Sequence, residues 1–235
     1  MNDARDFDQH ADSYDLELNR GLGVSGEGKG YFAKGRVQWL KHCMQALPPQ
    51  PRSGIDYGCG VGDTTILFRD VFDLSSALGL DVSPRSLELA RLRHESKQCK
   101  FLSFDGHTPA EDADLVYCNG VFHHIPVAKR SGVLNYIFRC LRPGGVFALW
   151  ENNPWNPGTR YVMSRIPFDR DASTITPSQA TKLLQSEGFQ IIGTSYLFWF
   201  PRWLKALRFV EPYLSRIPLG AQYQVLSRRP KIEAR

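Results

Sequence analysis

One ten-residue stretch, GIDYGCGVGD at 54–63, constrains the fold more than any other part of this chain. A short apolar segment runs into glycines at alternate positions, Gly58, Gly60 and Gly62, and an amphipathic segment follows at 64–72. This order predicts a strand, a tight turn and a helix start in immediate succession. Because glycine tolerates positive φ and a first helical turn offers unpaired N–H groups, the turn is a candidate ligand-binding loop. A purely structural turn is the alternative, because the spacing is G-x-G-x-G rather than the G-x-G-x-x-G of dinucleotide-binding folds.

The composition restricts the class of protein. A length of 235 residues fits one large α/β domain, and the net charge of +5 is spread out rather than gathered into a basic stripe, so we expect no nucleic-acid partner. Five cysteines without a C-x-x-C pair predict neither a disulfide framework nor a metal site. The first residues lack the apolar segment of a signal peptide, and no apolar run approaches ~20 residues. We therefore expect a cytoplasmic protein without stable membrane insertion, and leave a peripheral membrane contact open.

From residue 53 onward, strand-like and helix-like segments alternate. Candidate strands lie at 53–57, 75–80, 99–103, 113–118 and 145–150, and candidate helices at 62–72, 84–96 and 126–140. Such alternation predicts right-handed crossovers and a parallel sheet with helices on both faces. Ligands bind such sheets at the carboxyl ends of the strands, so residues at these ends are the first candidates for a site.

The two flanks of this core have different patterns. Residues 1–50 carry helical spacing at 7–19 and 31–47, and we expect them to form an N-terminal helical cap over the site. The core then spans 51–235, with a poorly periodic, proline-rich insert at about 152–175. Beyond the insert we expect a helix at 177–187, a strand at 189–200, an amphipathic helix at 201–214 and a last strand at 220–227.

Two aspartates follow the predicted second and third strands. Asp81 comes 23 positions after Gly58, where a carboxylate can accept two hydrogen bonds from a ribose diol. Asp81 could instead cap the next helix, but Ser83 can fill that role and leaves Asp81 for a ligand. Asp105, beside Gly106, could accept from an adenine amino group, and a plain turn aspartate is the alternative.

The predicted fourth strand ends at Asn119-Gly120, and a short turn then presents two adjacent histidines, His123 and His124. Neighbouring side chains are not expected to face one site together, and two adjacent histidines without a third ligand make a poor metal site. His124 lies at the strand end nearest the expected reacting atom, so it is the candidate general base. A structural histidine bonded to the backbone is the alternative.

These stretches together resemble the ordered motifs of class I S-adenosylmethionine-dependent methyltransferases. The resemblance rests on residues 55–62, 79–83, 119–126 and Leu141-Arg142-Pro143-Gly144-Gly145, and it covers 53 to about 151 in the family's order and spacing. It implies a Rossmann-like seven-stranded sheet, mostly parallel with an antiparallel last strand. It also implies S-adenosylmethionine as cofactor, with S-adenosylhomocysteine as product.

The resemblance assigns roles residue by residue. Gly58 and Gly60 would let the backbone approach the methionine moiety, and Asp56 would orient that end of the cofactor. Asp81 would hold the ribose and Asp105 the adenine amine. Asn119 would offer its backbone carbonyl to the cofactor's amino group. The expected set is completed by Cys59, Val82, Gly106 and Gly120. Tyr57 stands where the family usually has an apolar residue.

Residues outside these motifs are candidates for the remaining contacts. Tyr14 could meet the sulfonium and Arg36 the methionine carboxylate, whereas a buried stripe of cap helices is the alternative for Tyr14. The expected acceptor pocket contains Tyr31, His123, Glu151, Asn153, Trp155 and Trp199. Asn153-Pro154 resembles the Asn-Pro-Pro-Tyr element of nitrogen methyltransferases, but it follows the fifth strand rather than the fourth, so that role is not transferred.

We therefore expect a methyltransferase acting on a small organic acceptor. The aromatic segment 196–204 and the nearby Arg202, Lys205 and Arg208 favour a lipophilic or anionic acceptor, although a dimer face, a membrane contact and ordinary core also fit. Whether oxygen, nitrogen or carbon is methylated, and the oligomeric state, are not encoded. Two alternatives stay open: a nicotinamide-dependent oxidoreductase and a non-catalytic cofactor-binding partner subunit.

Overall fold

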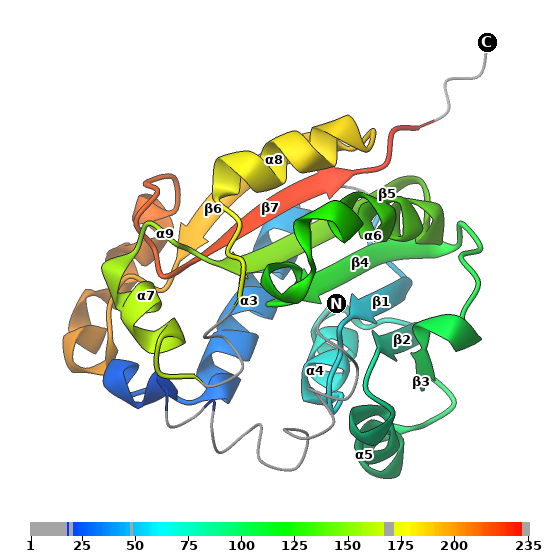
Figure 1. The fold of residues 1–235 in the computed structure, drawn as a ribbon, viewed down its shortest axis with the longest axis horizontal. Coiled ribbons are helices and arrows are strands. Elements are labelled where there is room, and N and C mark those ends of the chain that lie inside the picture. The colour runs from blue at the N-terminus through cyan, green and yellow to red at the C-terminus, as the bar shows by residue number, and fades with distance from the viewer. Residues whose placement is uncertain (1–17, 19–20, 48, 167–171, 232–235) are drawn as a thin grey trace.

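Within the described residues, seven strands form a single sheet in the order β3-β2-β1-β4-β5-β7-β6 (Figure 1). The computed structural model describes residues 18, 21–47, 49–166 and 172–231. The strands are β1 Ser53–Tyr57, β2 Ser76–Asp81, β3 Cys99–Ser103, β4 Ala113–Asn119, β5 Leu141–Asn152, β6 Gln190–Leu197 and β7 Gln222–Arg228. Only β7 runs against its neighbours, β5 and β6. The predicted fold class is therefore confirmed.

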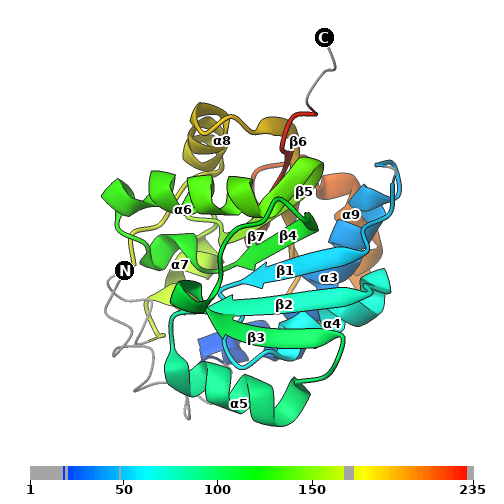
Figure 2. The same cartoon turned by 90° about the vertical axis from the view of Figure 1, so that its right-hand side faces the viewer.

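Helices cover both faces of the sheet (Figure 2). One face carries α3 (Lys29–Met44), α4 (Asp63–Phe72) and α5 (Pro84–His94), and the other carries α6 (Val127–Cys140) and α8 (Pro177–Ser186). Because successive side chains of a strand point to opposite faces, β4 supplies Leu115 and Tyr117 to one core and Val116 and Cys118 to the other. A strand covered on both sides needs apolar residues at nearly every position, which explains its continuous apolar sequence.

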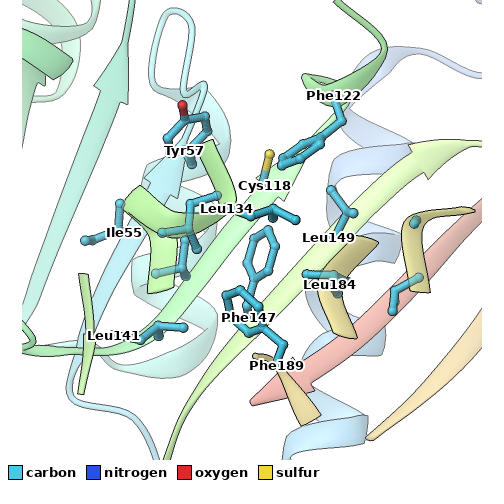
Figure 3. Packing of buried hydrophobic residues seen from close by; sticks show 14 of the residues in the cluster. Ile55, Tyr57, Cys118, Phe122, Leu134, Leu141, Phe147, Leu149, Leu184 and Phe189 are labelled. Carbon is cyan, nitrogen blue, oxygen red and sulfur yellow. The ribbon is translucent and has the colours of Figure 1, made fainter. Parts of the chain in front are cut away.

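The core on the α6 and α8 side combines aliphatic side chains with aromatic contacts. Figure 3 shows Phe147 of β5 beside Phe189, and their ring centroids are 5.7 Å apart. On the opposite face α3 buries Val37, Leu40 and Met44. The first fifty residues therefore contribute a helix that packs directly on the sheet. The helical spacing predicted at 7–19 lies almost entirely outside the described residues.

Local signals account for several helix starts. Ser83 caps α5 by accepting from the Ser86 N–H at 3.1 Å, and Pro84 occupies the first turn. Thr176 and Gln179 form a complete capping box at the start of α8, as their spacing predicted. No helix in the described part of the chain is both long enough and apolar enough to cross a membrane.

Two expected segments differ in the structure. The insert contains a helix, α7 (Pro157–Met163), which begins where the Asn156 side chain accepts from the Thr159 N–H. The helix expected at 201–214 is instead a 3₁₀ segment, η5 (Arg202–Val210), followed by the short α9 (Glu211–Leu214). No residue of η5 or α9 is buried, so core packing does not favour a regular α-helix there.

A buried carboxylate fixes the end of the sheet opposite to the glycine loop. Asp114 at the start of β4 accepts from the Arg52 and Ser53 N–H groups at 2.6 and 2.9 Å, and the Arg142 side chain lies 2.8 Å away. These bonds join the beginning of β1 to β4 and β5. The three central strands are thereby held together at this end of the sheet.

Replacing Asp114 by alanine is expected to lower the free energy of unfolding by about 2–3 kcal/mol, because two N–H groups lose their acceptor. Urea denaturation monitored by circular dichroism measures the change. Asp112→Ala removes an exposed carboxylate two residues earlier and is the matched control, with an expected change within about 0.5 kcal/mol. Equal destabilisation by both variants would contradict this role of Asp114.

Candidate functional site

The loop after β1 presents bare backbone to a cavity. Gly58 and Gly60 have φ of 77° and 53°, a region that side chains other than glycine rarely adopt. A Cβ at Gly58 would come within 2.3 Å of Val121 Cγ2. A Cβ at Gly60 would meet no atom within 4 Å, so the Gly60 backbone faces open space. The loop therefore leaves room for a ligand to approach the main chain.

Asp81 at the end of β2 holds this loop in place. Its carboxylate accepts from the Gly60 N–H at 2.8 Å and from the Ser83 N–H at 2.9 Å, and the side chain is buried. Ser83 caps α5 as expected, and its own N–H, separate from the capping side chain, donates to Asp81. Asp81 thus both shapes the loop and borders the cavity.

This first cavity has a volume of about 300 Å³ and lies at the carboxyl ends of β1, β2 and β4. It gathers eight of the expected cofactor-binding residues: Arg36, Gly58, Cys59, Gly60, Asp81, Val82, Asn119 and Gly120. Phe104, which precedes Asp105, also lines it. Tyr14 lies outside the described residues. Asp56, Asp105 and Gly106 are described but do not line the cavity.

Asp56 lies behind the loop rather than in the cavity. It is buried, and its carboxylate accepts from the Thr65 hydroxyl of α4 at 2.7 Å. Burial raises the pKa of Asp56 to about 7, against the lowering effect of the Thr65 bond. Asp105 is exposed in the 3₁₀ turn Phe104–Gly106, where the Gly106 N–H donates to the Ser103 hydroxyl.

Arg36 is a buried cation between two strands. Its Nε donates to the Tyr117 hydroxyl at 3.0 Å and its Nη1 to Gln222 Oε1 at 2.9 Å. Within the described residues its hydrogen bonds therefore go to neutral groups. A buried guanidinium without a hydrogen-bonded carboxylate suits an anionic ligand, because such a ligand would offset the cost of burying the charge.

A second cavity of about 410 Å³ adjoins the first. Both are lined by Leu18, Lys29, Arg36, Asn119, Gly120 and His124. Aromatic rings form much of the second wall: Tyr31, Phe32, Phe198, Trp199, Phe200 and Trp203. Phe198 packs against Phe32 with centroids 4.9 Å apart, which joins α3 to the segment after β6. The second cavity is thus built from the two flanks of the chain.

Both histidines of the turn after β4 border the second cavity, so the expectation that they would not face one site together is wrong. The turn is a 3₁₀ segment, η3 (Phe122–His124), which does not send successive side chains to opposite faces, and the two rings lie 4.0 Å apart. His123 is buried with its Nδ1 2.6 Å from Glu151, whose other oxygen accepts from the Phe122 N–H. Glu151 therefore braces the turn.

Only some of the residues expected in the acceptor pocket line the second cavity. Tyr31, His123 and Trp199 line the second cavity, whereas Glu151, Asn153 and Trp155 do not. Asn153 is buried and donates to the Pro218 and Gly220 carbonyls, so it ties two loops together. Sequence reasoning missed Gln222 as a cavity residue, and no local pattern marks it because it reaches the cavity only through the pairing of β7 in the sheet. In the described residues, no group of three or more His, Cys, Asp or Glu is placed to hold a metal ion.

Comparisons with known proteins agree with this geometry. A family model described as a methyltransferase domain matches residues 55–149. Among curated relatives, the trans-aconitate 2-methyltransferase of Methylobacterium radiotolerans is 37% identical over 99 residues, which cover 42% of this chain and 37% of the relative. The Acidovorax sp. enzyme of that name is 28% identical over 172 residues, covering 72% of this chain and 66% of the relative. The chain thus spans less than two thirds of either relative.

Solved structures share the fold. An S-adenosylmethionine-dependent methyltransferase from Mesorhizobium loti superposes with a TM-score of 0.61 at 20% identity, covering 84% of this chain and all of that chain. One from Archaeoglobus fulgidus gives 0.58 at 14% identity, covering 82% and 94%. The chain is thus similar to a methyltransferase domain over residues 55–149, and it shares its fold with S-adenosylmethionine-dependent methyltransferases.

Proposed function

We propose that this protein transfers a methyl group from S-adenosylmethionine to a small organic acceptor with an apolar body. The observation that carries this proposal is the pair of adjoining cavities, one bordered by bare loop backbone and Asp81 and the other by aromatic rings. Asn119, Gly120 and His124 lie where the two cavities meet, so a donor in one and an acceptor in the other would face each other there. The family match favours this function over a nicotinamide-dependent oxidoreductase.

The residues of the first cavity fit this cofactor. The open space at Gly60 accommodates a ligand against the backbone, and the buried Asp81 carboxylate borders the same space for a ribose diol. Arg36 would bind the methionine carboxylate. Asp56 would act through Thr65 and the loop, as a positioning residue. Asp105 would contact the adenine amine from the rim beside Phe104.

The chemistry asks little of the protein beyond placement. The bound cofactor supplies an activated methyl group on a sulfonium. The side chains then have to align the acceptor and exclude water, which the aromatic wall of the second cavity does. His124 is the proposed base for an acceptor group that holds a proton at neutral pH, and an ionised acceptor needs no base.

The flanks of the chain would select the acceptor. We propose that residues 1–50 act as the cap, since α3 supplies Tyr31 and Phe32 to the second cavity. The curated relatives are named for trans-aconitate, a carboxylate. The aromatic wall here supports an acceptor with a larger apolar body. None of the five cysteines is in a disulfide, which supports a reducing, cytoplasmic location.

Methyl transfer is tested directly with S-adenosylmethionine that carries a tritiated methyl group. We expect label to pass into a component of a metabolite extract. A panel of pure candidate acceptors, tested in parallel, should include trans-aconitate and lipophilic carboxylic acids. Label that stays on the cofactor in every extract, with S-adenosylhomocysteine still bound, would contradict the proposal and indicate a non-catalytic binding subunit.

Asp81→Asn should weaken S-adenosylhomocysteine binding by roughly 10–100-fold in calorimetry, whereas replacement of the exposed Asp105 by asparagine should weaken it by less than about fivefold.

Asp56 predicts a pH dependence of stability. Its folded pKa of about 7 lies above the ordinary aspartate pKa of 3.8, so the unfolded chain releases this proton first as pH rises. Stability from this group is therefore full below about pH 4 and falls until about pH 7, by on the order of 4 kcal/mol. Urea unfolding at several pH values should show that the free energy of unfolding of Asp56→Asn rises relative to that of the wild type across this window. Asp112→Asn is the control. A difference in unfolding free energy between Asp56→Asn and the wild type that does not change with pH would contradict the raised pKa of Asp56.

Trp199 and Trp155 form a matched pair for the acceptor cavity. Trp199 lines it, whereas Trp155 is 45% exposed and does not. Trp199→Ala should raise the KM for the acceptor by about tenfold or more and leave the affinity for S-adenosylhomocysteine unchanged, because it removes apolar contact area only from the second cavity. Trp155→Ala should leave both constants near their wild-type values. A larger effect at Trp155 would place the acceptor elsewhere.

A further inference from the structure

A segment near the end of the chain exposes an unusual concentration of large apolar side chains. In the described part of the chain twelve such side chains are exposed, and six of them lie between residues 202 and 219. They are Trp203, Leu207, Phe209, Tyr213, Ile217 and Leu219. This segment, which we term the 202–219 surface, comprises η5, α9 and the following turn. Concentrations of this kind on a protein surface mark interaction sites.

The exposed charges of the 202–219 surface are all positive. Arg202, Lys205 and Arg216 are exposed, whereas the only acidic residue in this range, Glu211, is half-buried and accepts from the Phe200 N–H at 3.0 Å. Arg208 pairs inward with Glu27 at 2.9 Å. Exposed Trp, Phe and Tyr interspersed with Lys and Arg are the composition that binds the interface of an anionic bilayer.

The same surface adjoins the mouth of the second cavity. Trp203 is 76% exposed and also lines that cavity. Arg202 lies over the turn at Gly26, and the exposed Val24 of the same turn lines the cavity as well. In Figure 1 this segment forms the orange edge of the molecule, on the opposite side from α5 and β3. An acceptor held in a membrane would therefore reach the cavity without crossing water.

We propose that the 202–219 surface binds a lipid bilayer containing anionic lipid and places the mouth of the second cavity against it. Charge favours a bilayer over the two alternative occupants of this surface, a second copy of the chain and a partner protein. In an isologous dimer the positive side chains of one copy would face those of the other, which is unfavourable. The centre of a protein interface is depleted in lysine and other charged residues, whereas here Lys205 lies among the aromatic residues.

Co-sedimentation with vesicles tests the proposal, using phosphatidylcholine alone and phosphatidylcholine mixed with phosphatidylglycerol. We expect binding to the mixed vesicles only, weakened by salt. Lys205→Ala with Arg216→Ala removes two exposed cations and should weaken binding on the order of twentyfold. Phe209→Ala with Tyr213→Ala should weaken it by about tenfold or more. Both pairs lie outside the first and second cavities, so folding and cofactor binding should be unchanged.

The matched control is Leu92→Ala with Arg93→Ala, which removes an exposed apolar residue and a cation from α5. Binding should be unaffected by this pair. Equal binding to both vesicle types, no binding, or equal effects of all three pairs would overturn the proposal. A dimer in sedimentation equilibrium that Phe209→Ala with Tyr213→Ala abolishes, without vesicle binding, would assign the surface to a second copy. The assay contains neither cofactor nor acceptor, so its failure leaves the proposed methyl transfer intact.

Discussion

The hydrogen bond from the Gly60 N–H to the Asp81 carboxylate is the interaction on which the site depends. It links the loop after β1 to the end of β2, two neighbouring parallel strands whose carboxyl ends meet at one edge of the sheet. Two N–H groups donate to this buried carboxylate and offset part of the cost of its burial. Gly60 can offer its N–H because it adopts a positive φ. The cavity is consequently shaped by rigid strand ends before any ligand binds.

The two cavities differ in how the chain builds them. Apart from Leu18 and α3, the first cavity uses residues between Tyr57 and Ile125, which lie in the stretch that the methyltransferase-domain model matches. The second brings together the two flanks of the chain through Arg36 with Gln222, Phe32 with Phe198, and Arg208 with Glu27. The similarity to relatives therefore bears most directly on the first cavity. The chemistry of the acceptor has to be inferred from the aromatic residues of the second cavity.

Sequence reasoning succeeded where local patterns decide the structure. The strand ending at Tyr57 and the capping box at Thr176 follow from short-range chemistry, and both lie where expected. It failed where packing decides: η5 is a 3₁₀ segment because nothing buries it, and Asn153 ties loops together instead of lining a pocket. Contacts such as Arg36 with Tyr117, 81 residues apart, have no local signal. The start of α7 is different, because Asn156-Pro157 is a local capping signal inside the segment that is expected only to be a poorly periodic insert.

A crystal structure of the complex with S-adenosylhomocysteine tests the central claim most directly. The account predicts electron density for the amino acid portion over the backbone of Gly58 and Gly60, and for the ribose hydroxyls beside the Asp81 carboxylate. It also predicts that the sulfur faces the boundary with the aromatic cavity. Density for the ligand at another site, or a ribose far from Asp81, would contradict the account.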